Sequence, residues 1–152
     1  MPLHPLIIHF PIVFVFLACA GYSWQLFKQD DFMLKAAIYA HIAGIMGFAL
    51  AIITGQWAEA DTPHTPAIHE MIERHGLLSW VSVWLFALLY VWQLLRVKKM
   101  PVWEKWLFVA IFVGGTGIMA FSAHLGGRMV YEKGAGVVPM KEINMREVQS
   151  GK

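Results

Sequence analysis

The residues of this sequence most able to do chemistry are histidines in apolar surroundings. His9 lies in the apolar stretch that opens the chain, His75 begins the third such stretch, and His124 ends the fourth. Imidazole nitrogens bind transition metals and exchange protons near neutral pH. An ionisable side chain in a membrane span is costly and is a functional hypothesis by default. These three histidines are therefore the first candidates for a binding site.

Four apolar segments must position the histidines. Of the 152 residues, 58% are hydrophobic and only 14% are charged, whereas a soluble domain carries about 25% charged residues. The excess apolar surface must therefore face lipid, where a helix satisfies its own backbone. Each segment is close to the ~20 residues that cross a bilayer as a helix. The predicted spans are residues 6–27, 36–57, 77–95 and 106–124.

The connections between the spans are short, so sequential helices are expected to be antiparallel neighbours. The sequence thus predicts an all-α fold, an integral membrane up-down four-helix bundle formed by residues 1–138. Residues 139–152 form a polar C-terminal tail, and no internal repeat stands out. Thr65 and Pro66 predict a helix start before the third span. The glycines within residues 126–136 predict the end of the last helix.

The distribution of positive charge predicts the orientation of the bundle. Lysines and arginines gather in the first and third connections, near residues 28–35 and 96–105, whereas the second connection is mainly acidic. The positive-inside rule places the first and third connections in the cytoplasm. Both termini and the second connection then lie outside, which gives an N-out/C-out topology.

In this topology His9, His75 and His124 lie at similar depth near the outer side of the membrane. Gly117 and Ala120 precede His124 by seven and four positions, a spacing that puts them on the same helix face. We expect these two small residues to form a flat trough that leads to the imidazole. A trough beside several imidazoles could enclose a planar cofactor.

The prediction that follows is a b-type haem (heme b) held by His9 and His75. Haem iron takes axial imidazoles, and in a ring of four helices the first and third face each other diagonally. His124 is expected to be a reserve ligand, or a propionate or proton partner. His41 has no histidine partner on its side of the membrane, so we expect one haem and a packed His41. The remaining histidines, His4, His64 and His69, are expected to be solvated.

Two alternatives stay open for the same residues. Imidazole also binds zinc, copper and iron ions, so His9 and His75, with His124 and Glu73, could hold a metal ion for binding or transport. The histidines could also form a hydrogen-bonded pair in a binding or assembly subunit without haem. In that case the acidic second connection would meet a partner.

Catalysis by the polypeptide itself is not indicated. No serine has an evident base, and the single Cys19 can form neither an internal disulfide nor a thiolate metal cluster. The expected role is an electron carrier or a subunit of a redox complex rather than an enzyme. The expected partners are the lipid bilayer, a periplasmic cytochrome or membrane redox partner, and further copies of the chain in a homo-oligomer. The net charge of +2 does not indicate nucleic acid.

Both ends of the apolar region carry motifs that are typical of a known family. Residues 4–12 read HPLIIHFPI, and residues 123–137 read AHLGGRMVYEKGAGV. Together with His75 at the head of the third span, these motifs resemble the bacterial four-helix membrane proteins of domain-of-unknown-function family 2231.

The resemblance covers about residues 1–138 and implies a four-helix fold in the bacterial inner (cytoplasmic) membrane. It also implies His9 and His75 as pattern residues, whereas His124 is matched in only some members. Some relatives look fused or adjacent to c-type cytochrome modules, and this association favours electron transfer.

Overall fold

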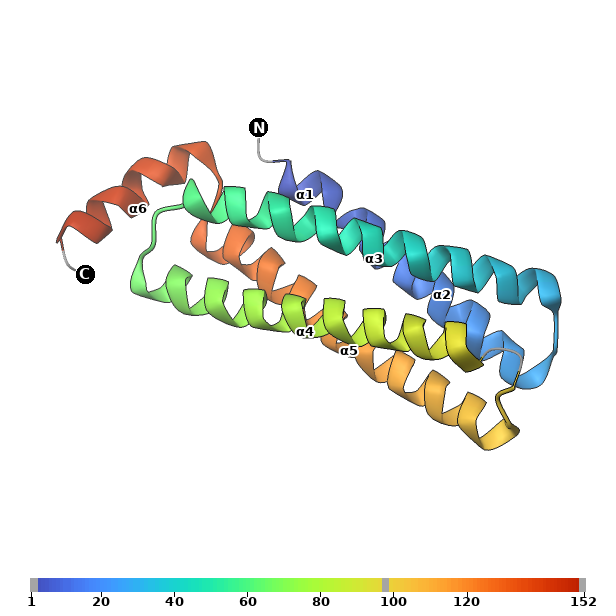
Figure 1. Cartoon of the computed structure of the whole chain (residues 1–152). Helices are drawn as coiled ribbons and strands as arrows, with labels where there is room; N and C mark the ends of the chain where they lie inside the picture. Colours follow the sequence, from blue (N-terminus) through green and yellow to red (C-terminus); the bar gives the residue numbers. More distant parts are fainter. Residues whose placement is uncertain (1–2, 97–98, 151–152) are drawn as a thin grey trace.

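The computed structural model describes residues 3–96 and 99–150, and all regular structure in these residues is helical. The predicted all-α fold is therefore confirmed. Figure 1 shows the helices α1 (His4–Ile7), α2 (His9–Phe27), α3 (Asp31–Ala60), α4 (Pro66–Arg96), α5 (Val102–Lys133) and α6 (Val138–Ser150).

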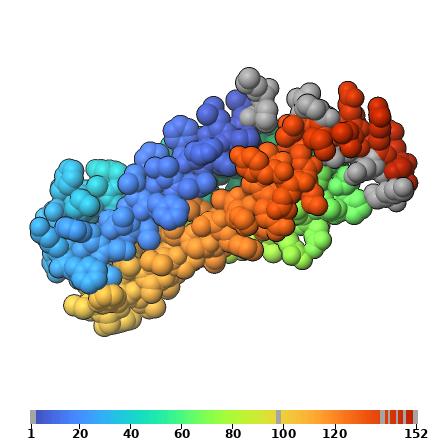
Figure 2. Space-filling model, turned by 180° about the vertical axis from the view of Figure 1, so that it is seen from behind, coloured from blue at the N-terminus to red at the C-terminus, as the bar shows by residue number. Residues whose placement is uncertain are grey.

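The four long helices form a ring. Helix α2 packs against α3 and α5, and α4 packs against the same two helices, so α2 and α4 are diagonal. Figure 2 shows α2 in blue beside α5 in orange. The α2–α3 and α4–α5 connections lie at one end of the bundle, here named the hairpin end (Figure 1). Both ends of the described chain and the α3–α4 connection lie at the opposite, terminal end, where α6 projects away from the bundle.

The bundle spans a membrane. Residues His4–Phe27 and helices α3, α4 and α5 are each long and apolar enough to cross a bilayer. Their outward faces expose large apolar side chains such as Phe16, Trp84 and Leu88, which lipid can cover and water cannot. The protein is thus the predicted up-down four-helix membrane bundle.

Local sequence sets the helix ends. Asp30 Oδ1 accepts hydrogen bonds from the backbone nitrogens of Phe32 at 2.9 Å and Met33 at 3.2 Å, which caps the start of α3. Helix α4 begins at the predicted point, because Thr65 Oγ1 accepts from the backbone nitrogen of Ile68 at 3.4 Å. Gly134 ends α5 with a φ of 65°, a left-handed conformation that glycine adopts without strain.

The first span is interrupted one turn from its start. Ile8 separates α1 from α2, and Pro11 follows three residues later. Proline has no N–H, so the carbonyl of Ile7 lacks its usual helical partner. Ile8 nevertheless keeps helical dihedral angles, with φ −60° and ψ −23°, so His4, seven residues before the buried Pro11, lies on the same face as Pro11 at the terminal end.

Close contacts between α2 and α3 depend on small residues. An added Cβ at Gly21 would lie 2.7 Å from Cβ of Ala37, and one at Gly47 would lie 2.9 Å from Cδ of Pro11. Membrane helices associate through such close approaches, because lipid removes the hydrophobic driving force between them. These glycines therefore hold the first hairpin together.

The two helical hairpins repeat each other with a register of 71 residues, which corrects the expectation that the chain has no repeat. Four of the five buried residues of α2 lie 71 positions before the buried residues in the span of α4: Pro11 before Ser82, Val15 before Phe86, Ala18 before Leu89, and Tyr22 before Gln93. The fifth, Gly21, corresponds to the partly buried Trp92. Buried residues of α3 and α5 pair likewise: Ala37 with Phe108, His41 with Phe112, and Gly44 with Gly115. Because α2 and α4 are diagonal, an approximate two-fold axis along the bundle relates the hairpins.

Replacing Gly47 by alanine is expected to destabilise the bundle, because the new Cβ would collide with Pro11. Overpacking of this kind costs about 1–3 kcal/mol of unfolding free energy. Thermal unfolding of the purified protein in detergent measures the loss. Gly114→Ala is the matched control, because a Cβ added there meets nothing within 4 Å. Equal melting temperatures of the two variants would contradict the packing.

Candidate functional site

Two histidines meet at the terminal end of the bundle, His4 from α1 and His75 from α4. Their ring centroids are 6.4 Å apart and their planes make an angle of 81°. Both side chains are half-buried. Of this pair, the sequence predicted only His75 as a site residue.

The His75 ring is held by helix α5. Its Nδ1 lies 2.8 Å from the carbonyl oxygen of Ser122 and 3.1 Å from Oγ of the same residue. A carbonyl only accepts hydrogen bonds, so Nδ1 carries the hydrogen and donates it. In the neutral ring, Nε2 then keeps its lone pair. Ser79 Oγ extends the network, since it lies 3.0 Å from Ser122 Oγ.

The His4 ring is held by helix α3 in the same way. Its Nδ1 lies 3.2 Å from Thr54 Oγ1. The Thr54 hydroxyl donates to the carbonyl of Leu50 at 2.9 Å, so its oxygen can accept from Nδ1. Among the residues that the structure describes, none forms a hydrogen bond with Nε2 of His4 or of His75.

Each ring also packs on a helical glycine. An added Cβ at Gly55 would lie 3.1 Å from Cε1 of His4, and an added Cβ at Gly126 would lie 3.2 Å from Cε1 of His75. The 71-residue register relates His4 to His75, Ala51 to Ser122, and Gly55 to Gly126. The internal repeat therefore builds both imidazole positions from the same parts.

The other predicted site residues lie on exposed faces of their helices. His9 comes two residues before the buried Pro11, which puts it ~200° around the helix from the buried side. The expectation that His9 faces His75 across the core is therefore not met. Gly117, Ala120 and His124 share an exposed face of α5, and a Cβ added at Gly117 would meet nothing within 4 Å.

A site for a bare metal ion does not assemble among the described residues. They contain no group of three or more His, Cys, Asp or Glu side chains that could hold an ion. Structural and catalytic zinc sites have three or four protein ligands. The paired imidazoles instead offer two nitrogen lone pairs, which suits a metal whose other ligands come from a macrocycle.

A third histidine, His41, is completely buried on α3, about three turns from the start of that helix, and is packed rather than snorkelling. The Tyr22 hydroxyl lies 3.3 Å from its Nδ1, and its Nε2 lies 3.0 Å from the carbonyl oxygen of Phe86. The carbonyl requires the hydrogen on Nε2, so Tyr22 donates to Nδ1. The tautomer of His41 is thus opposite to that of the two histidines at the terminal end.

Sequence reasoning missed His4, although one pattern pointed to it. Residues 4–7 read HPLI and residues 75–78 read HGLL, so a histidine heads the first and the third span in the same way.

The fold and the paired imidazoles define a four-span membrane protein with a two-histidine site at one end. The family model described as predicted membrane protein (DUF2231) matches residues 1–139. The chain belongs to this family, as its motifs indicated. No curated protein and no solved structure matches it.

The hydrogen bonds predict the tautomer of each buried ring. In cofactor-free protein, His75 is expected to carry the hydrogen on Nδ1 and His41 on Nε2, because those atoms face carbonyl oxygens. His4 is expected to carry it on Nδ1, because the Thr54 hydroxyl beside that atom already donates to Leu50. Two-bond nitrogen–proton correlation spectra of protein labelled with ¹⁵N-histidine measure this, with single His→Gln variants to assign the signals. Finding His75 with its hydrogen on Nε2 would contradict the arrangement.

Proposed function

We propose that the protein binds one b-type haem between His4 and His75 and transfers electrons. The observation that carries the proposal is the pair of equivalent imidazoles, 6.4 Å apart, each with its Nδ1 side bonded to a neighbouring helix. A bound haem would supply a one-electron iron couple. This proposal keeps His75 from the sequence prediction and replaces His9 by His4.

The separation of the rings suits two axial ligands of one iron. Imidazole nitrogen binds a transition metal at about 2.0 Å, and the ring centre lies roughly 1.2 Å behind that nitrogen. With this bond length, two imidazoles bound on opposite sides of one metal would have ring centroids about 6.4 Å apart. The ring centroids of His4 and His75 are 6.4 Å apart.

Neighbouring residues accept a hydrogen bond from the second ring nitrogen of each histidine, as metal-binding imidazoles require. A ligating histidine usually donates its second ring N–H to a carbonyl or another oxygen, which fixes the tautomer and the ring orientation. The Ser122 carbonyl does this for His75, and the Thr54 hydroxyl does it for His4. Gly55 and Gly126 leave space for the rings.

The orientation of the bundle sets the proposed partner. The positive-inside rule puts the hairpin end, with its lysines and arginines, in the cytoplasm. In a bacterial inner membrane the terminal end, which carries the imidazole pair, would then face the periplasm. A haem there would exchange electrons with a periplasmic cytochrome or a redox protein in the same membrane.

Variants of four histidines test the ligand pair. The protein is expressed with ample haem, purified, and examined by its visible absorbance spectrum. His4→Ala and His75→Ala are each expected to remove the spectrum of a haem with two axial histidines. His9→Ala and His124→Ala are the matched controls and should retain it, because both side chains are exposed.

Two outcomes of this experiment contradict the proposal. A wild-type protein without a Soret band or bound iron would leave the imidazole pair with a structural role in a binding or assembly subunit. A full spectrum in both His4→Ala and His75→Ala would show that haem binds elsewhere.

The glycine beneath His75 gives a second test of the same site. Gly126→Val is expected to lower haem content several-fold, because the added side chain would displace the imidazole ring. Gly127→Val is the control, since an added Cβ at that position meets nothing within 4 Å. Equal haem content in the two variants, measured as absorbance per protein, would show that Gly126 does not position the ligand.

A further inference from the structure

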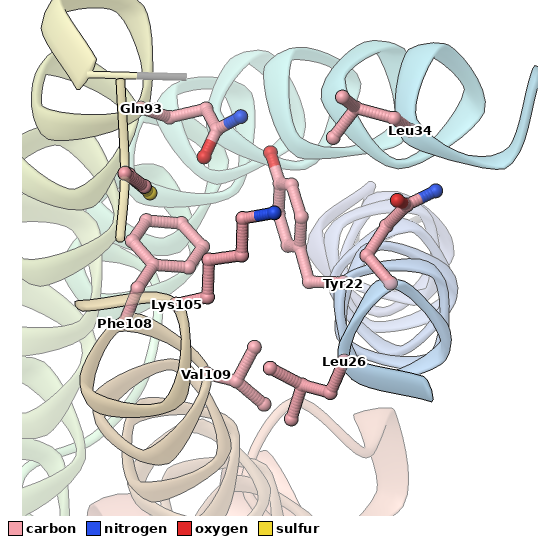
Figure 3. Close-up of a pocket in the computed structure, with 9 residues that line it drawn as sticks. Tyr22, Leu26, Leu34, Gln93, Lys105, Phe108 and Val109 are labelled. Carbon is pink, nitrogen blue, oxygen red and sulfur yellow. The ribbon is translucent and has the colours of Figure 1, made fainter. Parts of the chain in front are cut away.

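A small cavity lies at the hairpin end of the bundle, far from the imidazole pair, with an apolar lining interrupted by a few polar side chains. Its volume is about 60 Å³. Figure 3 shows the Gln93 amide, the Tyr22 hydroxyl and the Lys105 amine turned toward the same space. The rest of the lining is mainly apolar and includes Leu26, Leu34, Met100, Phe108 and Val109.

Gln93 makes this cavity unusual. The residue is only 3% exposed, and no hydrogen bond joins its amide to another residue that the structure describes; the amide atoms are not sealed off, however, but reach the cavity. An amide without a hydrogen-bond partner costs about 1–3 kcal/mol, and water in the cavity can supply the partners that the neighbouring side chains do not. The cavity therefore needs an occupant that can donate and accept hydrogen bonds.

The volume limits what that occupant can be. Pockets for organic ligands usually measure about 300–1,000 Å³, well above the 60 Å³ of this cavity. A buried water needs about 10–15 Å³ of such volume and 2–4 polar partners. The cavity thus has room for roughly four water molecules, with Gln93, Tyr22 and Lys105 as their partners.

The cavity connects to the buried histidine through Tyr22. The hydroxyl of Tyr22 lines the cavity and donates to Nδ1 of His41 at 3.3 Å. The rings packed around His41 are those of Tyr22 from α2, Phe86 and Tyr90 from α4, and Phe112 from α5. The two tyrosines are thus the titratable groups in ring contact with His41, and Lys105 is the charged residue of the cavity.

We propose that this cavity holds a cluster of water molecules, and that the waters and Tyr22 carry protons from the hairpin end to His41. Nδ1 of His41 accepts the proton that Tyr22 passes on, and Tyr22 regains a proton from the adjacent water. The path ends at His41, because its Nε2 side is bonded to the carbonyl of Phe86. The proposal does not depend on haem.

Radiolytic hydroxyl-radical labelling of wild-type protein in nanodiscs tests for the waters. Radicals form from bound water, so Tyr22 is expected to be modified several-fold faster than Phe112, although both rings are buried. Mass spectrometry of the two peptides measures the rates. A Tyr22 rate no higher than that of Phe112 would mean a dry cavity and overturn the proposal.

Two variants sharpen this result. Gln93→Leu removes the buried amide and should lower the Tyr22 rate to that of Phe112. Gln56→Leu is the matched control and should leave it unchanged, because Gln56 is an exposed residue near the terminal end of α3.

Exchange of the Cε1 hydrogen of His41 for deuterium tests the proton path, because this exchange requires a protonated ring in contact with solvent species. Tyr22→Phe keeps the aromatic ring but removes the hydroxyl, so exchange at His41 should slow several-fold. Exchange at the exposed His64 should be unchanged. An unchanged rate at His41 would overturn the path through Tyr22.

Discussion

A polar side chain inside an apolar bundle needs a hydrogen-bond partner, and this requirement governs where the histidines of this protein lie. His75 turns to the carbonyl of Ser122 on the neighbouring helix, and His4 turns to the hydroxyl of Thr54. His41, in the middle of the core, bonds to both Tyr22 and the carbonyl of Phe86. The buried imidazoles thereby fix the rotation and the depth of the helices that carry them.

The 71-residue repeat makes the two imidazole positions equivalent. Two hairpins of the same design, related by an approximate two-fold axis, each present one imidazole at the same depth. Among the described residues this site offers two equivalent imidazoles, a donor set that would suit the axial positions of the proposed haem. The same repeat places Tyr22 and Gln93 together at the hairpin end, where they line one cavity.

Much of the fold was predictable, because the membrane leaves few choices. Four apolar stretches with short connections predict the observed ring of four helices, and the start of α4 follows from Thr65 and Pro66. His75 was singled out by its position at the head of a span. His4 was not, because its depth alone suggested a solvated residue, although its spacing of seven residues, about two helical turns, before the buried Pro11 puts it on the inner face.

The sequence by itself determined that the chain spans a membrane four times and that histidines gather at one end. Only the tertiary structure decided which side of each helix faces inward. In a soluble helix, polar residues mark the outer face, but here lipid and core are both apolar, so the hydropathy of residues 4–27 does not distinguish His9 from His4. Packing made that choice, because Pro11 fits against Gly47 and this contact turns His9 away from the core.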